Sequence, residues 1–471
     1  MSKQLKWVTH HRSRPANNIA IRLQEIYAKF AHGKHPATTM LQARTPIAQQ
    51  MKNILTAILA IAATVAQAQQ ISYGEYMEKV LTNNIALTAQ RLNIEIATAN
   101  VKASKIHNNP TLGITYSSNE NWDKKLGYAI EGELSRTFTF GVRSGRIAVA
   151  KQEQRETTAL FEEYMRNFRA DATIAYLEHL KAIAKQQIAA DNEKDLAGVA
   201  HNDSVRYAKG DIAKADWLDS RMAAGLARNN RLAADAAVRS TAIRLGYYMG
   251  NLDNAEEIRG AGTLETEEPL YPVDTYIERA TANRADLQAA LCRVDIAEAA
   301  RKFNAAQRRT DIDIKVGATY NRGARAEEPF DPSFTTVKAG IAVPLKLSNL
   351  NKGARTADRL RVQQALQEAE NATLVVQSEV KEAYNEYLYA IMQTQTFTQQ
   401  MVKEMSEIVA NKRKAYEMGE ISFLDYISIE RRQNEMSDSY IESLFNKAVS
   451  WVELQRATGC GMEFSTKPIN E

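Results

Sequence analysis

The sequence predicts a mainly helical protein that also carries membrane-type β-strands, assembled from two copies of one helix-strand-strand-helix-helix unit. Three observations predict this class. The two halves of the chain resemble each other at fixed offsets, two runs of 52 and 65 residues contain no glycine or proline, and short segments before them alternate apolar and polar residues. Alternation at period two is typical of strands, and long uninterrupted runs are typical of helices.

An export signature lies inside the chain rather than at its start. The 13-residue uncharged run from Ile54 to Ala66 follows Met51 and Lys52 and ends in Ala-Gln-Ala. This layout is that of a signal peptide, and the run is too short to span a bilayer as a helix. We expect residues 51–68 to be a cleaved signal peptide and residues 1–50 a non-native or mis-assigned extension. The alternative is a basic arm that binds nucleic acid or anionic lipid.

The net charge of +4 depends on that N-terminal segment. Residues 1–50 hold eight basic residues and one acid, and Lys52 is a ninth basic residue, which leaves 51 basic and 55 acidic residues from Gln69 onward, a net charge of −4. We therefore expect no nucleic-acid partner. Cys292 and Cys460 lie 168 positions apart without a neighbouring histidine, which argues against a disulfide framework or a zinc site. We expect no cofactor. No cysteine follows the signal peptide, so no lipid anchor is expected.

Residues 69–250 and 274–460 form the two related halves, with a Glu-rich linker at 251–273 and a tail at 461–471. Residues 83–97 match residues 283–297 at an offset of 200. Further along the offset is 209, and there Tyr207 matches Tyr416 and Gly210 matches Gly419. Two long copies are too few for a solenoid, so we interpret them as a duplicated unit with internal pseudo-symmetry.

Each half is expected to open with a helix, at about 73–107 and about 274–309. Ser72 with Glu75, and Thr275 with Glu278, have the spacing of a capping box. In that motif the hydroxyl and the carboxylate satisfy unpaired N–H groups at the helix start.

Two strands should follow in each half, at about 111–117 and 127–138 and at about 311–320 and 334–346. The apolar side chains of the second pair alternate with polar ones, so they share one face. Aromatic residues near the strand ends match outer-membrane barrel strands, and the alternative is the edge of a soluble sandwich. The expected lipid-facing residues are Ile312, Ile314, Val316, Val337, Ile341 and Val343. Four strands cannot close a barrel, and unpaired edges are not tolerated in lipid, so these strands require an oligomer.

Long helices are expected at 143–249 and 350–458. The 65-residue run from Ala354 to Met418, as one helix, would reach about 97 Å. Its composition, rich in Ala, Gln and Glu, favours helices that pack side by side and keep one face exposed to solvent.

In this order the segments resemble the TolC-like outer-membrane efflux protein family, over Ile71 to Gly459. The resemblance is carried by NRADLQAALCRVDIAEA before DIDIKVGATY, by GIAVPLKL before NKGARTADR, and by the paired turns YAKGDIAKADWLDS and YEMGEISFLDYISIE. It implies a homotrimer whose twelve strands form one outer-membrane β-barrel, continued by a long periplasmic α-helical barrel. It also implies a periplasmic adaptor, or membrane fusion protein, that couples the channel to an inner-membrane pump of RND or ABC type. The implied role is the exit duct of a tripartite efflux or type I secretion system.

The two helix-to-helix turns are the candidate functional residues. Gly210 and Gly419 stand where a helix end requires a left-handed residue. In the family the matching turns contact the adaptor and form the closed aperture. Carried over, this marks Tyr207, Gly210, Asp211, Ile212, Tyr416, Gly419, Glu420 and Ile421. The alternative is that the glycines only end helices.

Asp216 and Asp425 match acidic positions just inside the tip, where symmetry would turn each into a ring of carboxylates. Ser422 with Asp425 is also a capping box, which is the competing role for that carboxylate. Ile421 and Ser428 stand where the family's best-known members have a basic residue and a second acid. A salt-bridged gate is therefore not expected, and contacts of Tyr416 are the alternative.

An enzyme is not expected. His107, His179 and His201 are not spaced as ligands, and no phosphate loop or nucleophile elbow occurs. His179 is expected to be solvated or to lie between helices. The competing functional hypothesis is an envelope coiled-coil scaffold or adaptor without a pore, which would leave the patterned strands and the duplication unexplained.

Overall fold

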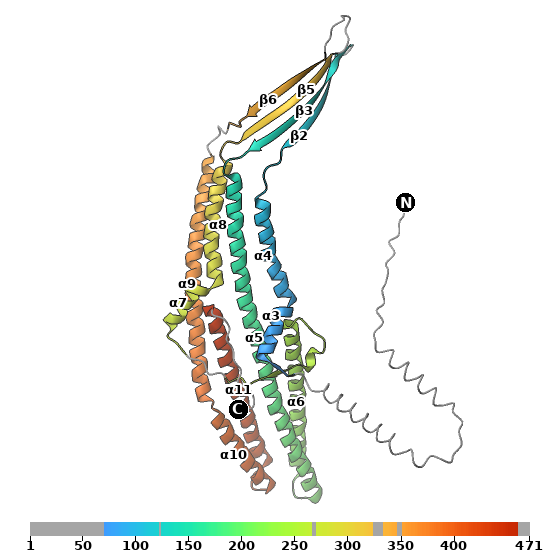
Figure 1. Cartoon of the computed structure of the whole chain (residues 1–471). Helices are drawn as coiled ribbons and strands as arrows, with labels where there is room; N and C mark the ends of the chain where they lie inside the picture. The colour runs from blue at the N-terminus through green and yellow to red at the C-terminus, as the bar shows by residue number, and fades with distance from the viewer. Residues whose placement is uncertain (1–69, 122–123, 266–269, 324–332, 346–350, 460–471) are drawn as a thin grey trace, which may run out of the picture. The chain divides into compact units, whose positions relative to one another are not determined.

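A computed structural model describes residues 70–121, 124–265, 270–323, 333–345 and 351–459, all within the unit that begins at Ala68 (Figure 1). The expected extension, signal peptide and C-terminal tail lie outside these residues. Within them the protein is mainly helical, as the sequence predicts. No helix in these ranges combines the length and apolar character needed to cross a bilayer.

The first half contains β1 (Gln70–Ser72), α3 (Tyr73–Asn83), α4 (Ile85–Ser104), β2 (Thr111–Asn121), β3 (Lys124–Phe138), α5 (Val142–Lys209) and α6 (Lys214–Tyr248). A connecting segment follows with η1 (Ala255–Glu257) and β4 (Arg259–Ala261). The second half contains α7 (Val273–Asn283), α8 (Ala285–Gln307), β5 (Ile312–Gly323), β6 (Phe334–Ala342), α9 (Lys352–Thr396), α10 (Gln399–Glu417) and α11 (Phe423–Thr458).

The opening helix of each half is interrupted near its start. Asn84 separates α3 from α4, and its side chain accepts hydrogen bonds from Ala86 N at 2.9 Å and Leu87 N at 3.2 Å. Arg284 separates α7 from α8 in the same way. Extended backbone at these two residues breaks the helical ladder, so the single expected helix becomes two.

One predicted helix start is confirmed and one is wrong. Ser72 and Glu75 form the capping box at the start of α3. Thr275 does not cap α7, because Pro272 stands at the N-cap and Thr275 N donates to Pro272 O at 3.0 Å. Pro272 has the extended ψ of an N-cap, and its carbonyl accepts the first bond of the helix, so the helix begins at Val273, two residues before Thr275.

The long runs behave differently in the two halves. α5 continues for 68 residues, about 100 Å, and passes through Gly145 and Gly198. The run from Ala354 to Met418 is not one helix, because extended backbone at Phe397 (φ −101°, ψ 92°) ends α9. Thr398 then caps α10 by accepting from Met401 N at 3.3 Å. Absence of Gly and Pro therefore did not exclude a break.

One antiparallel sheet joins the two halves in the order β2-β3-β5-β6. Its central pair places Leu134 of β3 opposite Val316 of β5, and Gly132 opposite Ala318. A second, two-stranded sheet pairs β1 with β4 in parallel. The larger sheet follows the ends of α4 and α8 and precedes α5 and α9, as Figure 1 shows.

The main core lies where α3, α5, α7, α9 and α11 meet, around the fully buried rings of Tyr76, Tyr176 and Tyr387. His179 of α5 is also fully buried and its Nδ1 lies 2.9 Å from Thr241 Oγ1 of α6, so it is interhelical rather than solvated. Burial lowers the pKa of His179 to about 4, and the charge of Arg259 acts in the same direction.

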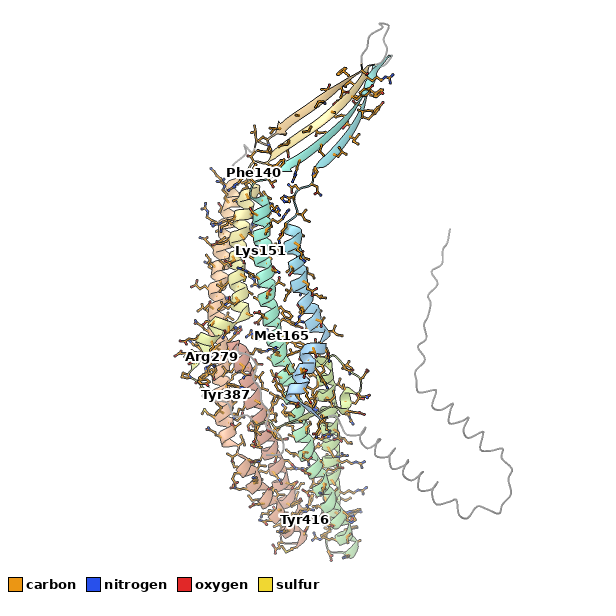
Figure 2. All side chains as sticks on the ribbon, in the orientation of Figure 1. Phe140, Lys151, Met165, Arg279, Tyr387 and Tyr416 are labelled. Carbon is orange, nitrogen blue, oxygen red and sulfur yellow. The ribbon has the colours of Figure 1, made fainter. Side chains whose placement is uncertain are left out.

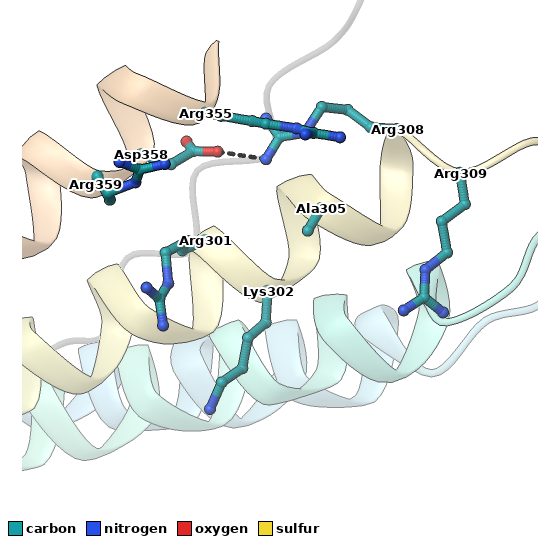
Figure 3. Close-up of a pocket in the computed structure, with 8 residues that line it drawn as sticks. All are labelled: Arg301, Lys302, Ala305, Arg308, Arg309, Arg355, Asp358 and Arg359. Carbon is teal, nitrogen blue, oxygen red and sulfur yellow. Dashed lines mark hydrogen bonds and ion pairs between the residues drawn. The ribbon is translucent and has the colours of Figure 1, made fainter. Parts of the chain in front are cut away.

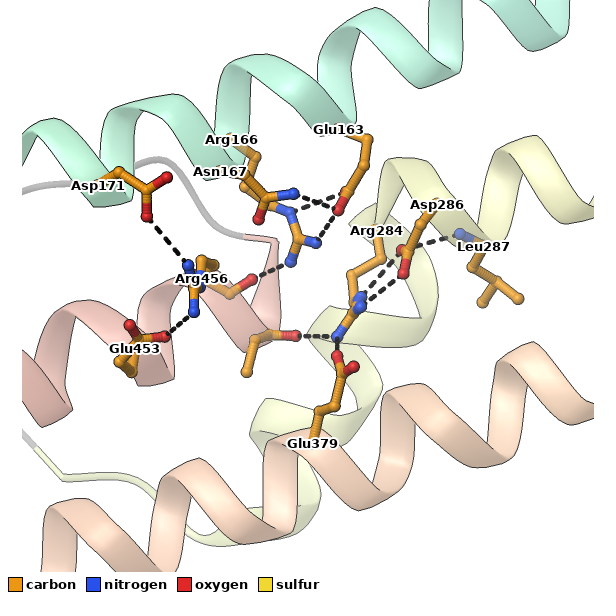
Figure 4. Close-up of polar contacts among 11 residues, drawn as sticks. Glu163, Arg166, Asn167, Asp171, Arg284, Asp286, Leu287, Glu379, Glu453 and Arg456 are labelled. Carbon is orange, nitrogen blue, oxygen red and sulfur yellow. Dashed lines mark hydrogen bonds and ion pairs between the residues drawn. The ribbon is translucent and has the colours of Figure 1, made fainter. Parts of the chain in front are cut away.

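Matching contacts hold the ends of α6 and α11. Asn84 Nδ2 donates to Tyr248 O at 2.9 Å, and Arg284 Nη1 donates to Ala457 O at 3.2 Å. These pairs stand at the same sequence offsets, 200 and 209, as the two halves. Figure 4 shows the second contact, in which Arg284 also binds Asp286 and Glu379.

Candidate functional site

Two helix-to-helix turns have the same backbone conformation. Gly210, between α5 and α6, has φ 87°, and Gly419, between α10 and α11, has φ 79°. In each turn the N–H groups of the glycine and of the next residue donate to carbonyls of the preceding helix. In the first turn Gly210 N donates to Tyr207 O at 3.0 Å and Asp211 N donates to Arg206 O at 2.8 Å. In the second turn Gly419 N donates to Tyr416 O and Glu420 N donates to Ala415 O. These bonds satisfy helix-end carbonyls, and the left-handed conformation expected at both glycines is observed.

A stacked ring pair stands beside each turn. Tyr207 stacks on Trp217 with ring centroids 4.9 Å apart and planes 2° apart. Tyr416 stacks on Tyr426 at 5.7 Å and 9°. These four rings are also related by the offset of 209, but their surroundings differ: Tyr207 is 37% exposed, whereas its counterpart Tyr416 is 5% exposed.

Tyr416 belongs to the buried pair, and Figure 2 labels it near the ends of the helices that lie farthest from the sheet. Its hydroxyl donates to Asp203 Oδ2 of α5 at 2.8 Å, and Asp203 is only 1% exposed. Arg206 lies 3.7 Å from the other oxygen of that carboxylate, with its guanidinium 5.5 Å from the Tyr416 ring centroid. Burial raises the pKa of Tyr416, and the hydrogen bond and charge of Asp203 raise it further. The hydroxyl therefore remains a neutral donor that ties α10 to α5.

An apolar cluster surrounds this contact. It contains Leu196 and Val199 of α5, Ala227 of α6, Val409 and Tyr416 of α10, and Phe423, Tyr426 and Ile427 of α11. Ile421 packs against it from the turn. We call the cluster together with Asp203 and Arg206 the tip cluster.

Two further charged contacts lie beside the tip cluster, one between α10 and α5 and one within α11. Arg413 Nη1 of α10 donates to Asp195 Oδ1 of α5 at 2.7 Å. Glu430 of α11 is 4% exposed, and the Tyr426 hydroxyl lies 3.5 Å from its Oε2. Burial raises the pKa of Glu430, and the charge of Asp195 adds to this effect.

Sequence reasoning missed Asp203, Arg206 and Glu430. A signal was present, because Leu196, Val199 and Asp203 follow the 3–4 spacing of an inward-facing helix stripe. Glu430 likewise continues the spacing of Phe423 and Tyr426. A charged residue at an apolar seam position indicates a buried polar contact, although the spacing alone does not name its partner.

The two predicted constriction acids have different local roles. Asp425 is exposed and closes a capping box, because Ser422 N donates to its Oδ2 at 3.4 Å and Asp425 N donates to Ser422 Oγ at 3.2 Å. Asp216 lies in the first turn of α6, and Ala213 at that N-cap makes no side-chain bond. The capping role of Asp425 is therefore confirmed, while a constriction role for either acid stays a prediction.

The four remaining turn residues lie at the protein surface. Asp211 and Glu420 are exposed, and Ile212 and Ile421 are half-buried. Their role as a docking surface stays a prediction.

The sheet has one apolar and one polar face. The register aligns Ile314 with Ile341, Ala318 with Val337 and Leu134 with Val316, so these side chains share a face. That face is exposed: Val337 is 77% and Ile114 is 74% accessible. The expected lipid-facing residues Ile312, Ile314, Val316, Val337 and Ile341 all lie on it, and Val343 follows the end of β6.

The opposite face carries charge. Lys315 of β5 pairs with Glu133 of the adjacent strand β3 at 3.3 Å. Lys338 of β6 pairs with Glu131 of β3, two strands away, at 3.2 Å. An exposed apolar face opposite a charged one is the pattern of a strand layer between lipid and water. In the parts of the chain that the structure describes, no His, Cys, Asp or Glu side chains are grouped as a metal site would require.

The comparisons with known proteins agree with this architecture. Residues 276–460 match the family model of the outer membrane efflux proteins. The Campylobacter jejuni CmeC outer membrane channel has a TM-score of 0.68 at 12% identity, over 82% of this chain and 85% of that one. The open state of the Neisseria gonorrhoeae MtrE outer membrane channel has a TM-score of 0.65 at 16% identity, over 82% and 88%.

A third structure, the outer membrane protein VceC from Vibrio cholerae, has a TM-score of 0.64 at 16% identity, over 83% of this chain and 96% of that one. No curated protein matches the chain by sequence. At these identities the solved structures show the fold. Together with the family match they confirm the resemblance to TolC-like outer-membrane efflux proteins.

Proposed function

We propose that this chain, as a TolC-like outer-membrane efflux protein, forms the outer-membrane exit duct of a tripartite efflux or type I secretion system. The observation that carries the proposal is the four-stranded sheet with one exposed apolar face and one charged face. In water such a face would be an aggregation hazard, whereas in a bilayer it is matched by lipid tails.

The same sheet requires further copies of the chain. Among the described strands, β2 and β6 each pair on one side only. Backbone groups at an open edge cannot be left unpaired in the hydrocarbon layer, so the edges must meet those of other copies. Three copies would supply twelve strands, enough to enclose a barrel, and the helices would continue the duct into the periplasm.

The helix turns are the proposed periplasmic tip. Tyr207, Asp211 and Glu420 are exposed there and are available to a periplasmic adaptor. The buried contact of Tyr416 with Asp203 holds α10 against α5, which supports a closed aperture without the salt bridge of the best-known members. Through the adaptor the duct would receive cargo from an inner-membrane pump of RND or ABC type.

Single-channel conductance of the detergent-purified protein in a planar bilayer tests the duct. We expect a small cation-selective conductance, because rings of Asp216 and Asp425 would attract cations. The Asp216→Ala, Asp425→Ala variant should conduct more and lose selectivity. A matched control, Glu278→Ala with Glu435→Ala, removes two exposed acids distant from the turns and should leave both properties unchanged. A folded, membrane-extracted oligomer that conducts neither as the wild type nor as the Asp216→Ala, Asp425→Ala variant would contradict the duct and favour an envelope scaffold.

A further inference from the structure

A strongly basic pocket lies between α8 and α9, close to the sheet (Figure 3). It has a volume of about 490 Å³ and is lined by six basic side chains: Arg301, Lys302, Arg308, Arg309, Arg355 and Arg359. No residue of the tip cluster contributes to it. The proposed roles of the tip cluster therefore do not account for the positive charge of this pocket.

One acid lines the pocket, and its hydrogen-bonding capacity is already used. Asp358 is 4% exposed and accepts from Arg308 Nη2 at 2.7 Å and from Asn304 Nδ2 at 2.9 Å. Arg361 lies 3.3 Å from the same carboxylate on the other side. Asp358 therefore fixes Arg308 in position and cannot also neutralise the rest of the lining.

Three lining arginines retain uncompensated charge. Arg301, Arg355 and Arg359 are exposed, and none lies within 4.0 Å of an acidic oxygen among the residues that the structure describes. Like charges gathered in one pocket repel one another, so binding of an anion there is favourable.

The first half uses the matching arginine differently. Arg146, which corresponds to Arg355, donates from Nε to Ser104 O at 2.9 Å and from Nη2 to Ile106 O at 2.5 Å. It thereby closes the C-terminal end of α4. Arg355 makes no such bond to the end of α8 within the described ranges, so its guanidinium remains available to a ligand.

The pocket also lies at a defined depth. α8 ends at Gln307 and the apolar face begins at Ile312, while α9 begins at Lys352 after β6 has ended at Ala342. If the sheet lies in the hydrocarbon layer, as the proposed function requires, the pocket lies at the level of the lipid headgroups on the periplasmic side. Basic side chains at that level bind anionic lipid.

We propose that this pocket binds the phosphate group of an anionic phospholipid headgroup in the periplasmic leaflet of the outer membrane. The proposal rests on the proposed function for its position in the bilayer. Arginine is suited to this ligand because its planar fork donates two parallel hydrogen bonds to phosphate oxygens. Arg301 and Arg355 would bind the phosphate from the two helices, with Arg308 held in place by Asp358.

Native mass spectrometry of the detergent-purified oligomer tests the proposal, with phosphatidylglycerol and phosphatidylcholine offered at equal concentration. The wild type should retain phosphatidylglycerol preferentially. The variant Arg301→Gln, Arg355→Gln, Arg359→Gln should retain at least tenfold less, because each basic side chain near an anionic lipid surface contributes roughly a factor of five. The control Arg91→Gln, Arg228→Gln, Arg239→Gln removes three exposed charges elsewhere and should bind like the wild type.

Equal retention by the pocket and control variants would overturn the proposal, as would equal losses in both. Binding of soluble glycerophosphoglycerol or inorganic phosphate as tightly as the lipid would overturn the assignment to a lipid. Loss of the oligomer in the pocket variant alone would overturn the assignment to a lipid and would place these arginines at a contact between copies of the chain. Conductance measured on the same preparations separates the two hypotheses, because a conducting protein without lipid preference contradicts only the pocket.

Discussion

Tyr416 of α10 donates its hydroxyl to the buried carboxylate of Asp203 on α5 at 2.8 Å, across 213 positions of sequence. The matching residue of the first half, Tyr207, lies exposed against Trp217 and makes no such contact with a carboxylate in the described residues. The two turns therefore share a backbone conformation but differ in their contacts: Tyr416 is anchored to a neighbouring helix, whereas Tyr207 is open to solvent.

Tyr416→Phe should loosen this anchor. The substitution keeps the ring stack and leaves Asp203 buried without its donor, at a cost of about 1–3 kcal/mol. Amide hydrogen exchange in the tips of α5 and α10 should accelerate, and the resting conductance should rise. Tyr207→Phe is the matched control, since its ring is exposed. Unchanged exchange in Tyr416→Phe would contradict the anchoring role.

His179 should make stability depend on pH. Its ring in the folded protein has a pKa of about 4, and that of an unfolded chain has a pKa of about 6.5. The unfolded chain therefore takes up the proton first as pH falls. The contribution of neutral His179 to the stability of the folded protein is therefore fully present above about pH 6.5. This contribution, about 3 kcal/mol, is lost as the pH falls from about 6.5 to about 4.

The measurement for His179 is the apparent unfolding midpoint by circular dichroism across that range of pH. His179→Gln should flatten the profile, because its side chain does not titrate. His201→Gln, an exposed site on the same helix, should retain the wild-type profile. An identical slope in both variants would show that other groups cause the pH dependence.

Arg284→Met should destabilise the junction of α7, α8 and α11. Arg284 is 2% exposed and satisfies Ala457 O, so its loss should cost about 1–3 kcal/mol. Its two acidic partners, half-buried Asp286 and exposed Glu379, can both reach water and would add little. Arg293→Met, which removes a half-exposed arginine paired with Glu156, should stay within about 1 kcal/mol. Thermal unfolding of both variants provides the comparison.

Two adjacent positions on β6 test the orientation of the sheet. Val337 lies on the apolar face and Thr336 on the polar one. Val337→Arg should reduce assembly in the outer membrane, since arginine on a lipid-facing strand costs about 2–4 kcal/mol near the bilayer midplane. Thr336→Arg should assemble normally. The amount of heat-resistant oligomer in outer-membrane fractions distinguishes them, and the reverse result would invert the proposed lipid face.

The exposed acids of the two turns should be needed for transport but not for assembly. Asp211→Ala with Glu420→Ala removes two exposed turn acids without touching the tip cluster. We expect reduced efflux in cells with unchanged oligomer yield and conductance, because the duct itself is intact. Normal efflux would contradict the docking role of these residues.

The sequence by itself determined the features that depend on neighbouring residues. The alternation around Ile314 and Val316 predicted an apolar face, the Ser72 and Ser422 capping boxes predicted two helix starts, and Gly210 and Gly419 predicted left-handed turns. Each of these depends on a periodicity or a spacing of a few positions, which can be recognised without knowing how the chain packs.

Only the tertiary structure decided which distant residues meet. Sequence spacing does not predict that Tyr416 bonds to Asp203 or that the long run breaks at Phe397. It also does not predict that Arg301 and Arg355 line the same pocket. The predicted cap at Thr275 is wrong because Pro272 is the N-cap of α7, so Thr275 already lies inside the first turn of the helix. Local patterns specify elements, whereas side-by-side packing of helices far apart in sequence determines which charges become buried, paired or left available to a ligand.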